Sequence, residues 1–164
     1  MVLTVDMVES VVFPVNNAFP GSAVTAEIQF TNNTRDELWV NGRMAVDAFS
    51  DPPDHREVWL LINGPEGEEI PIECLKNIRP ASSEGYRVLK PGEHIAHREV
   101  LTNCFRLSRP GVYTLVAFYQ DGNPTPPPPP MGAKYVSVLI QSVPVTFRVG
   151  NVGDAASELQ RRPE

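Results

Sequence analysis

The stretch from Leu107 to Tyr119, LSRPGVYTLVAFY, constrains the fold more than any other part of the chain. Pro110 and Gly111 predict a turn, because proline fixes its own backbone angle and glycine accepts conformations that other residues avoid. The residues that follow alternate with the period of a β-strand. One face would carry Tyr113, Leu115, Ala117 and Tyr119, and the other would carry Val112, Thr114, Val116 and Phe118. A turn that opens directly into a long alternating strand predicts a β-protein.

Leu107, Gly111 and Tyr113 follow one another in the order found at a corner between strands E and F of immunoglobulin-like and fibronectin type III-like sandwiches, which this stretch resembles. In those families the tyrosine hydroxyl binds backbone a few residues upstream and fixes the crossover between the two sheets. The resemblance implies that role for Tyr113. It implies an architecture only, because such sandwiches carry many unrelated functions.

Composition agrees with one β-rich domain. The 164 residues are 41% hydrophobic and 21% charged, and 17 prolines and 11 glycines predict many turns and few long helices. We therefore predict one immunoglobulin-like Greek-key sandwich of about seven to nine antiparallel strands over residues 1–149, and a polar tail over residues 150–164. The formal net charge of −6 argues against a nucleic-acid partner, which would need a basic surface.

Several further strands are predicted by alternation. Residues 24–31 alternate without error, and a strand broken by Pro14 is expected near the N-terminus. Asn41-Gly42 lies between apolar runs, which predicts either a hairpin or a bulge in one long strand. Residues 58–62 are apolar on both faces and are expected to be covered on both sides, in a hairpin with residues 70–74.

The N-terminus and the cysteines bear on location. Residues 1–13 lack the features of a secretory signal, so a native Met1 predicts a cytoplasmic protein, whereas a Met1 added to a mature domain leaves it extracytoplasmic. No stretch approaches the ~18 apolar residues of a membrane helix, and no membrane insertion is expected. Cys74 and Cys104 can form a disulfide in an oxidising compartment, but two free, buried thiols are the favoured interpretation.

Candidate catalytic and metal-binding groups are weak. Asp51, Asp54, His55 and Glu57 lie within seven residues, but without a known metal-binding pattern they predict a solvated acidic loop. His94 and His97 fall on opposite faces of a strand and cannot chelate one ion. Cys104 lies in an apolar strand, where a reactive thiolate is not expected. No nucleophile elbow or phosphate loop occurs, so we predict a non-enzymatic protein without metal or cofactor.

The most informative polar feature is the loop over residues 120–133, which follows the strand that ends at Tyr119. It contains a proline run that adopts polyproline II without a core, and we expect it to project as a stiff arm that docks on a partner or serves as a spacer. In an immunoglobulin-like topology it shares one end of the sandwich with the loop at residues 32–36. The predicted binding residues are Asn32, Asn33, Arg35, Pro124, Pro126, Pro127, Pro128, Pro129 and Pro130.

A second resemblance covers residues 86–119 and extends toward Val149. The pattern Leu89-Lys90-Pro91-Gly92-Glu93, followed by Pro110-Gly111-Val112-Tyr113-Thr114, is similar to that of bacterial sandwich modules of the intracellular proteinase inhibitor type. This implies a loop inserted into a protease cleft as an alternative function. The favoured function is non-catalytic binding of another protein, as an accessory or structural subunit. A carbohydrate-binding module is a third alternative, with Trp39, Trp59 and Tyr135 as its candidate aromatic residues.

Overall fold

A computed structural model describes residues 23–46, 57–74, 85–121, 123 and 125–150. These residues form nine β-strands and one short 3-10 helix, with no α-helix among them. In chain order the elements are β1 (Thr25–Thr31), β2 (Leu38–Asn41), β3 (Val58–Asn63), β4 (Tyr86–Leu89), β5 (His94–Val100), η3 (Leu101–Asn103), β6 (Gly111–Tyr119), β7 (Lys134–Tyr135), β8 (Ile140–Gln141) and β9 (Val145–Val149). The all-β class predicted from the sequence is confirmed. No helix in the described part of the chain has the length and apolar character needed to cross a membrane.

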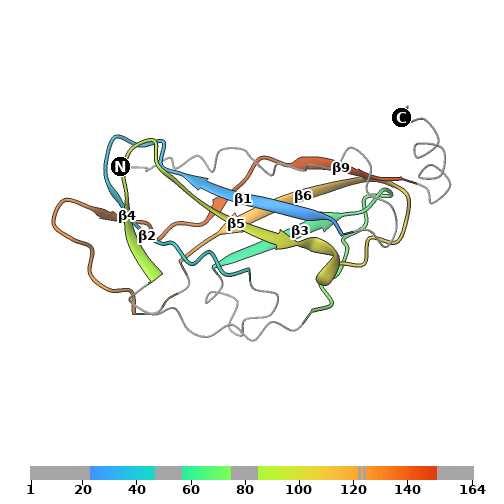
Figure 1. Cartoon of the computed structure of the whole chain (residues 1–164), viewed down its shortest axis with the longest axis horizontal. Coiled ribbons are helices and arrows are strands. Elements are labelled where there is room, and N and C mark those ends of the chain that lie inside the picture. The colour runs from blue at the N-terminus through green and yellow to red at the C-terminus, as the bar shows by residue number, and fades with distance from the viewer. Residues whose placement is uncertain (1–22, 47–56, 75–84, 122, 124, 151–164) are drawn as a thin grey trace, which may run out of the picture.

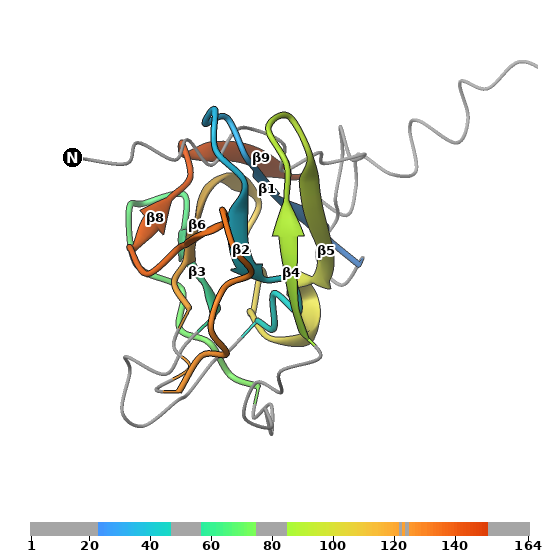
Figure 2. The same cartoon turned by 90° about the vertical axis from the view of Figure 1, so that its left-hand side faces the viewer.

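The strands lie in two layers (Figure 1; Figure 2). One layer contains the pair β1–β5, and the other is built on β6, which pairs with β3 on one side and with β8 and β9 on the other. A third, smaller sheet has the order β4-β2-β7 and lies at one end of the molecule. Every strand pair is antiparallel except β2–β7, which is parallel. That parallel pair departs from the fully antiparallel sandwich expected.

Alternation along the strands builds the core between the layers. In β1 the residues Ala26, Ile28 and Phe30 are buried, as predicted. In β6 the predicted inward set from Tyr113 to Tyr119 is buried as well. The rings of Phe30 and Tyr119 lie 5.0 Å apart between centroids, which shows that the two layers touch. Burial of large apolar side chains of this kind is the main stabilising contribution in a sandwich.

Tyr113 makes the contact expected at the entrance of its strand. Its hydroxyl donates to the carbonyl of Arg109 at 2.8 Å and accepts from the Arg109 N–H at 3.2 Å. The side chain is 1% exposed and its ring stacks on Phe147. Gly111 has a φ of 149°, and a Cβ there would come within 2.5 Å of Pro65, so a larger residue cannot enter this turn without displacing it. Leu107 is buried beside them in the core.

The prediction around Asn41-Gly42 is wrong in both of its forms. The strand β2 ends at Asn41, and the following residues neither return along β2 nor continue it. The Gly42 N–H donates to the carbonyl of Gly85 at 2.8 Å, and the carbonyl of Ala45 accepts from Val58 at 3.1 Å. Partners far away in the sequence therefore override the local turn signal. In β3 the residues alternate between buried and half-buried, so its second face is less covered than expected.

The expectation of two free thiols is also wrong, because Cys74 and Cys104 form a disulfide. The segment before Cys74 lies against the end of η3, where the Glu73 N–H donates to the carbonyl of Cys104 at 2.7 Å. Ile72 forms an isolated bridge with Phe105 in the same place. The predicted strand broken by Pro14, the residues Asp51, Asp54 and His55, and the tail after Gly150 lie outside the described residues.

Candidate functional site

Three connections meet at the end of the molecule where β2 and β4 lie (Figure 1; Figure 2). They are the loop at residues 32–37, the turn at residues 90–93 and the proline-rich loop at residues 120–133. The Asn32 N–H donates to the carbonyl of Glu93 at 2.9 Å, and Asn32 accepts from the Gly92 N–H at 2.8 Å. Lys134, directly after the proline-rich loop, forms an ion pair with Asp36. The sequence predicted that the first and third of these loops share one end.

Asn32 was predicted to bind a partner, and the structure assigns it a different role. Its side chain is 0% exposed. The amide nitrogen donates to the carbonyls of Asp36 and Leu89, both at 2.8 Å, and the amide oxygen accepts from the backbone and hydroxyl of Thr34. All of its polar groups are thus used in holding two loops together, so Asn32 is not available to a partner. Asn33 and Arg35, which follow it, are exposed.

The first limb of the proline-rich loop is fixed by Asp121, which is almost fully buried. The hydroxyls of Tyr86 and Tyr135 both donate to its Oδ2, at 2.6 and 2.9 Å, and its Oδ1 accepts from the Asn123 N–H at 3.1 Å. Burial, reinforced by the hydrogen bond to Asp121, raises the pKa of both tyrosines far above the usual value. Both phenols therefore remain neutral donors at ordinary pH, and the loop begins from a rigid base.

Trp39 of β2 holds the middle of the same limb. Its indole Nε1 donates to the carbonyl of Pro127 at 3.0 Å, and its ring lies 5.8 Å from that of Tyr86. Pro126 and Pro127 are only half exposed as a result. The expected projecting arm is therefore corrected: the limb lies against the body and only the residues beyond Pro127 extend away. Pro124 lies outside the described residues.

The second limb returns along β2 as the strand β7. The Lys134 N–H donates to the carbonyl of Glu37 at 2.8 Å, and the Val136 N–H donates to the carbonyl of Trp39 at 3.2 Å. These bonds produce the parallel pairing of β2 with β7. Both limbs are thus attached to one strand, with Trp39 in contact with each of them.

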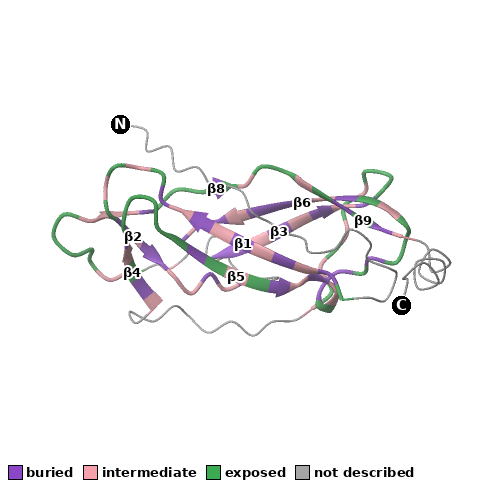
Figure 3. Ribbon diagram, turned by 45° about the horizontal axis from the view of Figure 1, so that its top comes forward, coloured by how far each residue is buried: buried purple, intermediate pink, exposed green. Residues whose placement is uncertain are grey.

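The tip of the loop, Pro128–Gly132, is exposed (Figure 3). The Ala133 N–H donates to the carbonyl of Pro130 at 3.1 Å, and Gly132 has a φ of 94°, which together define a tight β-turn with glycine in its third position. Met131 occupies the second position and is 102% exposed. No charged residue occurs between Asp121 and Lys134. The loop therefore presents an uncharged, largely apolar tip on two anchored limbs.

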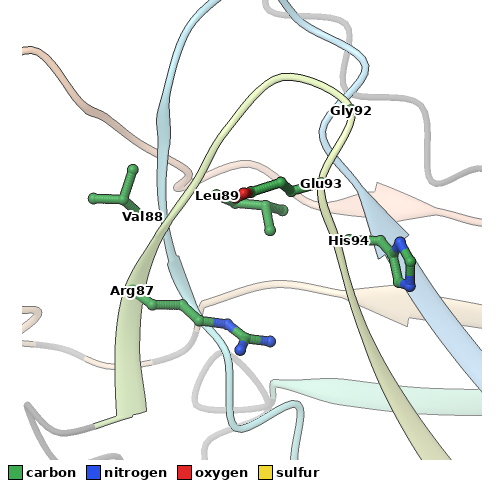
Figure 4. A pocket seen from close by; sticks show the side chains of 6 residues that line it. All are labelled: Arg87, Val88, Leu89, Gly92, Glu93 and His94. Carbon is green, nitrogen blue, oxygen red and sulfur yellow. The ribbon is translucent and has the colours of Figure 1, made fainter.

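A hollow of about 510 Å³ lies beside these loops and was not predicted from the sequence (Figure 4). Its lining comes from β4 and the following turn: Arg87, Val88, Leu89, Gly92, Glu93 and His94. The Glu93 carboxylate is used within the turn, where it accepts from the Lys90 N–H at 2.8 Å. The open hollow carries charges of both signs and does not form an enclosed site for a small molecule.

The candidate chemical groups do not assemble into a catalytic or metal site. Glu57 is buried and accepts from Asn41, from the Arg43 side chain and from the Ala45 N–H, so it is a structural carboxylate rather than part of a solvated loop. Cys104 is in the disulfide and cannot serve as a nucleophile while oxidised. Within the described ranges, no three His, Cys, Asp or Glu side chains are placed to hold a metal ion.

The three aromatic residues considered for carbohydrate binding do not share one surface. Trp39 and Tyr135 use their polar groups at the base of the loop. Trp59 lies in β3, in another sheet, and stacks on Phe118 with 5.2 Å between ring centroids. A row of coplanar rings on one face, which a sugar chain would need, is not formed by them.

Comparison with known proteins gives no further assignment. Neither the family models nor the curated proteins searched include a match to this sequence. The function must therefore be argued from the loop end itself.

Proposed function

We propose that this protein is a non-catalytic protein-binding module, an accessory or structural subunit of a larger assembly, that binds its partner with the proline-rich loop. The observation that carries the proposal is the uncharged tip Pro128–Gly132, exposed on limbs that hydrogen bonds hold to β2. A loop already fixed in one conformation loses little entropy on binding, which favours affinity. Tyr113 and its contact with Arg109 support the immunoglobulin-like resemblance of the scaffold.

The turn weighs against the inhibitor alternative. A loop that blocks a protease cleft as a substrate does is held extended, whereas the chain reverses between Pro130 and Ala133. Inhibition of a panel of serine and cysteine proteases by the purified protein would restore that alternative. The disulfide supports the extracytoplasmic of the two expected locations, because cytosolic thiols are normally kept reduced.

The test compares two triple variants in capture from an extract of the source organism, read by quantitative mass spectrometry. The tip variant is Pro128→Ser/Pro129→Ser/Met131→Ser. The control is Val112→Ser/Val138→Ser/Val143→Ser, which removes three exposed apolar side chains elsewhere. Proteins that enrich on the wild type and the control are expected to be lost from the tip variant, with its melting temperature nearly unchanged. If the tip variant captures the same proteins as the wild type, the loop is a spacer and the proposal fails.

A further inference from the structure

The exposed part of the loop does not offer the face that polyproline grooves recognise. Polyproline II has three residues per turn, so prolines three apart share one face. Within the run these pairs are Pro126 with Pro129 and Pro127 with Pro130. Each pair includes one half-buried proline, and the carbonyl of Pro127 is already bonded to Trp39. An aromatic groove of the kind that binds two such prolines would meet only one that is fully accessible.

The side chain that stands furthest from the body is Met131. It lies at the second position of the turn closed by Pro130 and Ala133, and the turn leaves its whole side chain in solvent. By contrast, Met44 is 1% exposed in the core. An unbranched thioether adapts to apolar pockets of irregular shape, and methionine is enriched at protein interfaces. Its complete exposure here, between residues without charge, gives no benefit to the folded monomer.

We infer that Met131 is the anchor of this interaction, inserting its side chain into a concave apolar pocket on the partner protein while Pro128–Pro130 hold the turn at a fixed height. This inference rests on the proposed function. A protein pocket is favoured over a lipid surface because the chain has a net charge of −6 and the uncharged tip has no basic residues to bind anionic headgroups. The partner surface is accordingly apolar and hollow at its centre, since a convex tip fills a pocket.

The partner pocket is first located by cross-linking. p-Benzoylphenylalanine is introduced in place of Met131 and, as a control, in place of Val112, which is exposed and lies away from the loop on β6. Irradiation in the source extract is expected to join position 131, and not position 112, to one protein, at residues that line an apolar pocket. Cross-links to a flat or charged surface, or none from position 131, overturn the inference.

The cross-linked protein, produced in recombinant form, is then the probe for binding measurements. Met131→Leu, which keeps an apolar side chain of similar volume, is expected to bind within a few-fold of the wild type, and Met131→Ala at least about tenfold more weakly, as for a truncated hot-spot residue. Wild-type binding by Met131→Ala overturns the inference. If the tip variant nevertheless fails to bind, the proposed function stands without it. Loss of binding by Pro129→Ala with Met131→Ala unaffected indicates a polyproline groove instead.

A chemical modification of the same side chain gives an independent readout. Hydrogen peroxide transfers one oxygen atom to the Met131 sulfur and leaves water, which converts an apolar thioether into a polar sulfoxide. Peroxide is expected to weaken probe binding by the wild type but not by Met131→Leu, which shares every other methionine. Equal sensitivity of both proteins would count against the anchor role. Sedimentation with phosphatidylcholine and phosphatidylserine vesicles is expected to show no binding, and Met131-dependent binding to them would assign the tip to lipid.

Discussion

Reduction of the Cys74–Cys104 disulfide is expected to lower the free energy of unfolding substantially. The bond joins residues 30 apart in the sequence. For a closed loop of this length, the chain-entropy relation gives about 12 cal/mol/K, or about 3.6 kcal/mol at room temperature. For a chain of this size, that corresponds to a fall in melting temperature of roughly 7–14 °C. The bond also holds the segment around Ile72 against Phe105, so that pairing should open first.

The assay is urea unfolding followed by tryptophan fluorescence, with and without a thiol reductant. The double variant Cys74→Ala/Cys104→Ala is the control, because it removes both cysteines of the chain and should not respond to the reductant. Thiol titration of the unfolded, unreduced wild type should find no free thiol. Two free thiols there would show that the bond does not form. A reductant effect below about 1 kcal/mol would refute the loop-entropy argument even if the bond is present.

Two further predictions concern the tyrosines. Tyr113→Phe removes a hydroxyl that both donates to and accepts from the backbone of Arg109, and it is expected to lower stability by about 1–2 kcal/mol in urea unfolding while leaving probe binding unchanged; no loss would show that the hydroxyl does not stabilise the turn. All four tyrosines have a pKa raised above 10 in the folded protein, chiefly by burial. Their folded-state pKa values exceed those of the unfolded chain, so this contribution to stability is complete below pH 10 and is lost as the pH rises above it. Phenolate absorbance should therefore appear only together with loss of the β-sheet circular dichroism signal, and ionisation near pH 10 with the fold intact would contradict the burial argument.

The sequence alone determined the features that depend on near neighbours. Alternation in β1 and β6 identified which side chains are buried, because successive residues of a strand point to opposite faces. The turn before Tyr113 and the turn closed by Lys90 and Glu93 were predicted from their proline and glycine residues, and both form. The proline run also marked the loop as the distinctive feature of the chain. Each of these patterns is contained within a few consecutive residues.

The tertiary structure decided everything that joins distant segments. Trp39 and Pro127 are 88 residues apart, and no local pattern links an indole to one carbonyl in a run of prolines. For the same reason the sequence predicted a free arm, free thiols and an accessible Asn32, whereas each of these groups has a partner brought to it by the fold. The exposure of Met131 follows from those contacts, because fixing both limbs leaves only the turn in solvent. Long-range hydrogen bonds and burial therefore chose which part of a predictable loop is free to bind.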